Sequence, residues 1–146
     1  MNDTERFCTF TLLVSGAHKA LRRAQEKYTR RLGLRSVHVA CMLQLLGASE
    51  GLSATELSRL CGVDRAQVSR VVGELERAGL LREAAPGDKR RYRGSLLLTN
   101  AGREQAEAMS GIVSSKLAEV SAELRADEVE TFYKVFRKIA DRLENI

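Results

Sequence analysis

Four polar side chains in the middle of the sequence, Arg65, Gln67, Ser69 and Arg70, have types and spacing that suit the recognition of nucleic acid. An arginine can donate two hydrogen bonds to a guanine edge, and a glutamine can pair with an adenine edge in the same way. A serine is short enough to reach a base or a phosphate, and Arg65, which comes first, can instead contact a phosphate. These residue types therefore predict a surface that reads double-stranded DNA.

A second, strongly basic group follows about twenty residues later. Residues 87–93 contain four basic side chains and one acidic side chain. The preceding Ala85-Pro86-Gly87 has the residues of a turn, so the basic group is expected at the tip of a hairpin. Arginine in a narrow minor groove gains from the enhanced negative potential there. The residues expected to make this second DNA contact are Asp88, Lys89, Arg90, Arg91 and Arg93.

The elements that must position these side chains can be predicted from periodicity and caps. A helix is expected over 64–78, capped by Asp64 and ended by Gly79, with an apolar stripe behind its polar face. Ser53 and Glu56 form a capping box for a short helix over 54–61. Strands are expected at 80–83 and 95–98. The stripe of the 64–78 helix consists of Val68, Val71, Val72 and Leu75.

Long helices are expected on both sides of this region. Apolar or small residues recur at a 3.5-residue period from Phe7 to Tyr28, and Gly33 ends that helix. A central helix spans 36–47, with Ser36 as a candidate cap. Thr99 or Asn100 caps a helix that reaches about residue 124, and Asp127 caps the last one. The sequence predicts a mainly α (α+β) winged helix-turn-helix, with a dimerisation helix at 1–34, a DNA-binding domain at 35–99 and dimerisation helices at 100–146.

Composition excludes several other classes of protein. The chain has 44% hydrophobic residues and 29% charged residues, as globular proteins do, and seven of its basic side chains lie within residues 19–35. It shows neither a signal peptide nor an apolar run of about 18 residues, so neither secretion nor a membrane span is expected. Three scattered cysteines favour the cytoplasm and, with two histidines, show no metal-ligand spacing. Because the sequence shows neither a phosphate loop nor a nucleophile motif, we expect that the protein is not an enzyme and needs no cofactor.

The stretches LSATELSRLCGVDRAQVSRVVGELERAGLL at 52–81 and PGDKRRYRGSLLLTNAGR at 86–103 resemble the MarR family of regulators. The family's wing has Asp-x-Arg, here Asp88 and Arg90, followed by Leu-Thr-x-x-Gly, here 98–102. The stretch between these two motifs is about two residues longer than the family's usual spacing. The residue that enters the minor groove is therefore open between Arg90, Arg91 and Arg93, and we expect Arg90, oriented by Asp88.

The resemblance implies a homodimer, joined through the first and the last two helices, that reads a palindromic operator. It also implies repression that a small phenolic or lipophilic ligand, or an oxidant, relieves. The resemblance places the ligand pocket near Phe10, Val14, His38 and Met42, although the apolar helix around His38 favours a hydrogen-bonded core or interface histidine over a ligand contact. Two alternatives remain open: a redox-sensing repressor that uses Cys8, and a winged-helix adaptor that binds protein.

Overall fold

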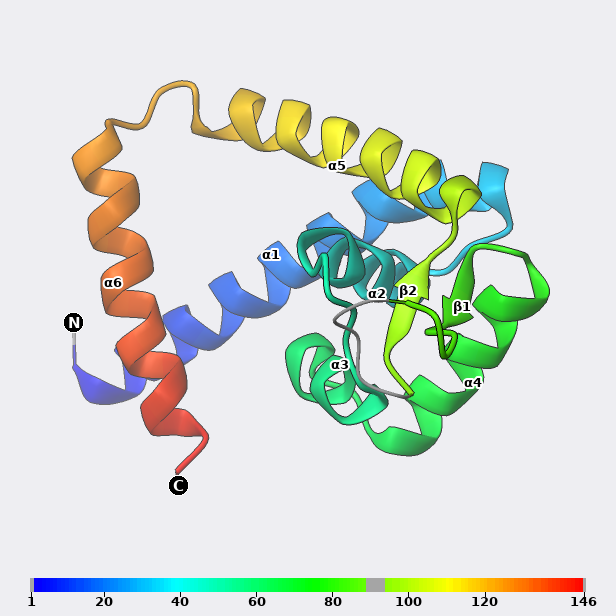
Figure 1. Cartoon of the computed structure of the whole chain (residues 1–146). Helices are drawn as coiled ribbons and strands as arrows, with labels where there is room; N and C mark the ends of the chain where they lie inside the picture. The colour runs from blue at the N-terminus through cyan, green and yellow to red at the C-terminus, as the bar shows by residue number, and fades with distance from the viewer. Residues whose placement is uncertain (1, 89–93, 146) are drawn as a thin grey trace. The chain divides into compact units, whose positions relative to one another are not determined.

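The structure is a computed structural model that describes residues 2–88 and 94–145. The chain divides into two compact units, Met1–Ser110 and Gly111–Ile146. The predicted strands and all six predicted helices are present (Figure 1). In chain order the elements are α1 Asp3–Leu32, α2 Ser36–Gly47, α3 Ala54–Cys61, α4 Arg65–Arg77, β1 Leu81–Glu83, β2 Leu96–Leu98, α5 Asn100–Ser121 and α6 Ala126–Leu143.

Helices α3 and α4 are joined by a short turn whose caps follow the sequence prediction. The Ser53 side chain accepts from the backbone N–H of Glu56, and Glu56 accepts from the backbone N–H of Ser53 at 2.7 Å. Gly62 ends α3 at φ 64°, a left-handed conformation that glycine adopts without strain. Asp64 caps α4 by accepting from the N–H of Gln67 at 2.7 Å. These caps set where α4 begins and therefore which of its residues face outward.

The two strands form an antiparallel pair beside α4. Leu81 lies opposite Leu98, and Glu83 lies opposite Leu96. Leu52, which precedes α3, adds an isolated bridge to Leu96. The hairpin is thereby tied to the segment that leads into α3, so wing and helices form one framework. The predicted winged helix-turn-helix is confirmed.

One apolar core holds the first unit together. It draws on α2, α3, α4, the two strands and the first turns of α5. Met42, Leu57, Val68 and Leu75 are completely buried, and deleting a side chain of this kind typically costs about 2–5 kcal/mol. The buried hydrophobic residues are Leu34, Val39, Cys41, Met42, Leu45, Leu57, Val68, Val71, Leu75, Leu80, Leu81, Leu96, Leu97, Leu98, Ala106 and Met109.

Helices α1 and α6 contribute little to burial within the chain. Thr29 is the one buried residue among the described residues of α1, and the N-terminal part of that helix extends away from the core (Figure 1). Helix α6 has no buried residue over Ala126–Leu143, yet its apolar side chains recur at helical spacing. No helix in the described part of the chain has the length and apolar character of a membrane span.

Two predicted caps are wrong. Ser36 is the first residue of α2 and not its cap, because the backbone N–H of Arg35 donates to His38 at 2.8 Å. The last helix begins at Ala126, so Asp127 lies inside it. The N–H of Arg125 donates to Glu128 at 2.9 Å, and Asp127 pairs with the Arg125 guanidinium. Thr99, one of two candidates for α5, does cap it by accepting from the N–H of Gly102.

Candidate nucleic-acid interface and a neighbouring pocket

The surface of α4 that faces away from the core carries two arginines. Val68, Val71 and Leu75 are buried on one side of the helix. At 100° per residue, the opposite side consists of four positions, which we call the outer face of α4. Two of the four are small, so the two arginine side chains meet little obstruction. The outer face comprises Ala66, Arg70, Gly73 and Arg77.

The other three residues of this helix that were predicted to contact DNA lie outside this outer face. Arg65 is exposed and donates to the hydroxyl of Thr55 at 2.5 Å, so its guanidinium lies beside the first turn of α3. Ser69 is exposed, and Gln67 is half-buried. Helix N-termini favour anions, so the position of Arg65 fits a phosphate contact better than a base contact.

The base of the wing is braced by Asp88. Its carboxylate accepts from the Arg82 guanidinium at 2.9 Å and from the backbone N–H of Ala85 at 2.6 Å. This ion pair raises the pKa of Arg82. The predicted orientation of Arg90 by Asp88 lies outside the described residues, as do Lys89, Arg91 and Arg93. Asp88 thus fixes the turn from which that basic segment departs.

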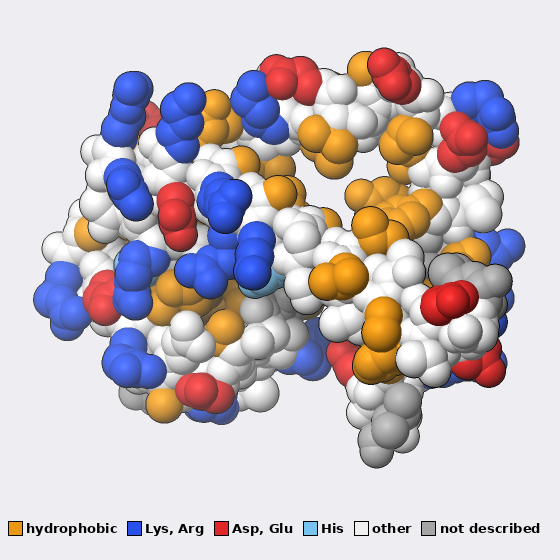
Figure 2. Space-filling model, turned by 180° about the vertical axis from the view of Figure 1, so that it is seen from behind, with side chains coloured by type: hydrophobic (Ala, Val, Ile, Leu, Met, Phe, Trp, Pro, Cys, Tyr) orange, Lys and Arg blue, Asp and Glu red, His pale blue; other side chains and the backbone are white. Residues whose placement is uncertain are grey.

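Basic side chains also gather on the C-terminal half of α1 and on the short loop that follows it. All seven basic residues of 19–35 are exposed, and Glu26 pairs with Arg22. In the view of Figure 2, Lys and Arg side chains are concentrated on the left half, where α1 ends and α4 lies. Clustered positive charge of this kind attracts a polyanion over several ångströms.

Two arginines at this surface were not among the predicted site residues. Arg77 occupies the outer face of α4 one heptad after Arg70, and its guanidinium lies near Gly73. The helical period of the buried stripe was the signal that could have identified it. Arg82 is placed by strand pairing with Leu97 and by Asp88, which is long-range information that no local pattern carries.

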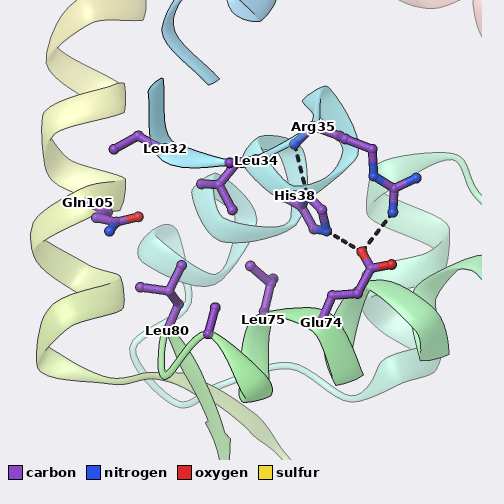
Figure 3. A pocket seen from close by; sticks show the side chains of 10 residues that line it. Leu32, Leu34, Arg35, His38, Glu74, Leu75, Leu80 and Gln105 are labelled. Atoms are coloured by element: carbon purple, nitrogen blue, oxygen red, sulfur yellow. Dashed lines mark hydrogen bonds and ion pairs between the residues drawn. The ribbon is translucent and has the colours of Figure 1, made fainter. Parts of the chain in front are cut away.

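A pocket of about 430 Å³ lies behind α4, among the end of α1, the start of α2 and α5. Its polar wall is a cluster of Arg35, His38 and Glu74 (Figure 3). The Glu74 carboxylate accepts from Arg35 at 2.7 Å and from His38 Nε2 at 2.5 Å. The guanidinium of Arg35 first, and then His38, hold the pKa of Glu74 below its ordinary value of 4.5.

The hydrogen bonds of His38 define its tautomer. The ring is 5% exposed, and Nδ1 accepts from the backbone N–H of Arg35. A neutral ring with its proton on Nε2 satisfies both this bond and the bond to Glu74. His38 is therefore a hydrogen-bonded core histidine that also lines the pocket, and its contact with a ligand stays a prediction.

The opposite wall of the pocket contains an unsatisfied acceptor. Gln105 reaches from α5 toward Leu34 and Leu80, across from the His38 cluster (Figure 3). Its buried Oε1 has no hydrogen-bond partner among the described residues. A buried acceptor without a partner is costly, so a ligand that presents a donor there would gain from it.

The structure separates the residues predicted to bind a ligand. Of the four, His38 lines the pocket, whereas Met42 is completely buried in the core. Val14 is 39% exposed and Phe10 is half-buried, and both lie further toward the N-terminus of α1 than the pocket's α1 residues. Cys8, the redox candidate, is exposed on α1. The described residues contain no group of three His, Cys, Asp or Glu side chains that could hold a metal ion.

Known proteins resemble this chain in sequence and in fold. A family model described as MarR family matches residues 33–91. A curated protein of Thauera aromatica, named as a candidate transcriptional regulatory protein for the hcr operon, is 31% identical over 99 residues. That match covers 67% of this chain and 58% of the relative.

Solved structures extend the likeness to almost the whole chain. MepR of S. aureus, solved in a DNA-binding conformation, has a TM-score of 0.82 at 17% identity and covers 92% of this chain and 98% of its own. A MarR family protein of Mycobacterium tuberculosis is 28% identical, with a TM-score of 0.59, over 88% of this chain and 91% of its own. With the winged helix-turn-helix framework and the matched segment 33–91, these likenesses show that the chain belongs to the MarR family of transcriptional regulators.

Proposed function

We propose that this chain binds double-stranded DNA in a sequence-specific manner and regulates transcription as a repressor. The observation that carries the proposal is the outer face of α4, where Arg70 and Arg77 flank the small residue Gly73. A recognition helix needs an apolar back that docks on its own domain and an unobstructed polar front. Helix α4 has both, on a turn fixed by Gly62 and Asp64.

The contacts divide into those that read bases and those that hold the backbone. Arg70 is proposed to pair with a guanine, and Gln67 and Ser69 to contact neighbouring bases from the flank of the helix. Arg65, held beside α3 by Thr55, is proposed to contact a phosphate. The basic segment after Asp88 is proposed to enter the minor groove, with Arg90 as its leading residue.

A homodimer is proposed to present two copies of α4 to a palindromic operator. An 18-residue helix with no buried residue has its apolar stripe free to pack on another surface. On α6, Phe132 is 58% exposed and Leu143 is 52% exposed, and on α1 Phe7 is 69% exposed. Two-fold symmetry would place the two recognition helices about one turn of DNA, roughly 34–36 Å, apart.

The pocket behind α4 is the proposed site of a small lipophilic or aromatic effector. Leu75 and Ala78 bring α4 itself into the pocket wall, and Leu34 and Leu80 supply apolar surface. A ligand that binds one position of α4 better than another shifts the protein toward that position. We propose that the favoured position is one in which the two copies of α4 no longer fit successive major grooves, which would release the operator.

The direct test is binding to DNA from the gene's own upstream region, measured by fluorescence anisotropy. We expect the affinity for that DNA to exceed the affinity for a scrambled duplex about 10³-fold or more. The affinity should fall steeply as salt is raised, since phosphate contacts release counterions. Equal, weak binding to both duplexes, or an affinity that does not depend on salt, would contradict the proposal and favour a protein-binding adaptor.

The dimer has a test of its own that does not depend on DNA. Phe132→Glu places a charge in the apolar stripe of α6 and should shift the protein toward monomer in analytical ultracentrifugation. Lys134→Glu introduces the same residue on the opposite side of that helix and should leave the assembly intact. Equal behaviour of the two variants would show that the stripe is not the dimer contact.

A further inference from the structure

Two cysteines that the DNA-binding surface does not use lie in contact inside the winged domain. Cys41 is on α2 and Cys61 is the last residue of α3. Their Sγ atoms are 3.7 Å apart, and the Cys61 thiol donates toward Cys41. Cys8, the remaining cysteine, is exposed on α1. No local sequence pattern pairs Cys41 with Cys61, because the packing of α2 against α3 brings them together.

We propose that Cys41 and Cys61 form a reversible redox pair, which a hydroperoxide converts to an intrachain disulfide that weakens binding to DNA. The effect on binding rests on the proposed function, whereas the disulfide itself does not. The modification joins α2 to the end of α3, immediately before the turn that leads into α4.

The exposure of the two thiols sets the order of the chemistry. Cys61 is partly exposed and Cys41 is completely buried, so a peroxide meets Cys61 first. The Cys61 sulfur attacks a peroxide oxygen, the O–O bond breaks, and Cys61 sulfenic acid and water (or an alcohol) result. Cys41 then attacks the sulfenic sulfur, the S–O bond breaks, and a second water leaves. The pair loses two electrons and two protons to one hydroperoxide.

The acidities of the thiols determine how fast the pair responds. Burial first, and then the neighbouring Cys61, raise the pKa of Cys41 to about 12. Burial also raises the pKa of Cys61, although its hydrogen bond with Cys41 offsets part of this increase. Thiolate is the reactive form, so the pair should remain reduced at trace peroxide and oxidise under sustained exposure.

Closing the disulfide requires the end of α3 to adjust. A disulfide bond is about 2.0 Å long, so the two sulfurs must approach by more than an ångström. Cys61 is followed directly by the left-handed Gly62, and the N–H of Val63 donates to the carbonyl of Ser58. The Ser58 hydroxyl donates to Val63 in return. A displaced Cys61 therefore moves the turn that sets the start of α4.

The experiment uses the full chain with Cys8→Ser, so that the exposed thiol cannot react. The protein is treated with hydrogen peroxide, and the intact mass, the linked peptides and the affinity for upstream DNA are measured before treatment, after it and after reduction with dithiothreitol. We expect a loss of about 2 Da, a peptide pair that joins Cys41 to Cys61, and about a tenfold weaker affinity that reduction restores.

A second variant keeps the test valid if the buried site tolerates no change. Cys61→Ala in the Cys8→Ser background replaces the partly exposed thiol, and its thermal unfolding confirms that it folds. Its affinity for DNA should be unaffected by peroxide. Cys41→Ala should likewise form no disulfide and should stop at oxidised Cys61, a gain of about 16 or 32 Da.

Three results would overturn the proposal. One is stable oxygenation of Cys61 with Cys41 left as a free thiol in the Cys8→Ser protein. Another is a Cys41–Cys61 disulfide that leaves the affinity for DNA unchanged. If the reduced protein does not bind upstream DNA at all, the proposed function fails together with this regulatory role, and the mass measurement still reports whether the disulfide forms.

Discussion

Gly102 on α5 lies directly against the carbonyl of Leu80, the residue that leads into β1. A Cβ atom at position 102 would stand 1.9 Å from the Leu80 oxygen, which no real Cβ contact allows. The neighbouring Thr99 donates from its hydroxyl to the Gly79 carbonyl at 2.7 Å and from its backbone N–H to Leu80. The Leu-Thr-x-x-Gly segment thus fastens the start of α5 to the strand that carries the wing.

We expect Gly102→Ala to lower the free energy of unfolding by about 1–3 kcal/mol, because the added methyl group meets backbone that cannot rotate away. Denaturant unfolding followed by circular dichroism measures the change. Gly111→Ala is the matched control on the same helix, since nothing lies within 4 Å of its Cβ position. The control should gain about 0.5–1 kcal/mol from helix propensity. Equal effects of the two substitutions would contradict the close contact with Leu80.

The cluster behind α4 predicts a specific dependence of stability on pH. Arg35 and His38 lower the pKa of Glu74 in the folded protein from 4.5, so the folded state binds this proton less tightly than the unfolded state. The stabilisation is therefore fully present above pH 4.5 and is lost as the pH falls through the lowered pKa. We expect Glu74→Gln to lose less unfolding free energy than the wild type between about pH 6 and about pH 3.

Chemical denaturation at several pH values measures this difference. Other carboxylates with lowered pKa values, such as Glu56, are present in both proteins, so their contributions cancel in the comparison. Glu76→Gln changes an exposed carboxylate two residues further along α4 and should keep the wild-type dependence on pH. If Glu74→Gln also keeps it, the ion pair with Arg35 does not stabilise the fold in solution.

Local signals accounted for most of the framework. The cap at Ser53, the turn at Gly62 and the cap at Asp64 depend on residues within three or four positions, so the sequence contained all that determines them. The same reasoning failed at Asp127. Glu128 accepts the Arg125 N–H from within the first turn, and this bond makes Arg125 the cap, so the helix starts two residues earlier than a cap at Asp127 would allow.

Long-range contacts account for what the sequence did not reveal. His38 was a candidate ligand contact, but its partner Glu74 is 36 residues away on another helix. Gln105 carried no signal at all, since its importance comes from facing the pocket across from that pair. Arg77 is a different case, because the helical period of the predicted apolar stripe already places it on the outer face of α4 together with Arg70.

The unsatisfied acceptor in the pocket leads to a prediction about stability and ligand choice. Gln105→Leu removes the buried Oε1 that lacks a partner among the described residues, so the free energy of unfolding should rise by about 1 kcal/mol. The same change should weaken the binding of effectors that carry a hydrogen-bond donor more than it weakens the binding of purely apolar effectors. Differential scanning fluorimetry with a panel of phenols and their methyl ethers measures both effects.

The control for this prediction is Gln44→Leu, which makes the same substitution at an exposed position of α2. It should change neither the unfolding free energy appreciably nor the ranking of the ligands. A destabilised Gln105→Leu protein would mean that the glutamine makes a favourable contact in solution. An equal loss of affinity for the phenols and for their methyl ethers would mean that no hydrogen-bond donor of the ligand reaches position 105.

Removal of each arginine on the outer face of α4 should weaken DNA binding in a different way. Recognition helices contact base edges with their N-terminal residues, and Arg70 is in that half of α4 whereas Arg77 is its last residue. We expect Arg70→Ala to cost about 1–3 kcal/mol of binding at one base pair and to relax the preference there. Arg77→Ala should weaken binding to all duplexes alike and reduce the salt slope of the affinity by about 0.9, as the loss of one phosphate contact does.

Affinity for a set of duplexes with single base-pair changes, measured at several salt concentrations, separates the two effects. Arg6→Ala removes the same charge from the first turn of α1 and should change neither the base preference nor the salt slope. If Arg70→Ala keeps the full base preference while the salt slope falls, Arg70 contacts a phosphate, and α4 enters the groove in a different orientation from the one proposed. If Arg77→Ala relaxes a base preference, the C-terminal half of α4 lies deeper in the groove than its counterpart in other recognition helices.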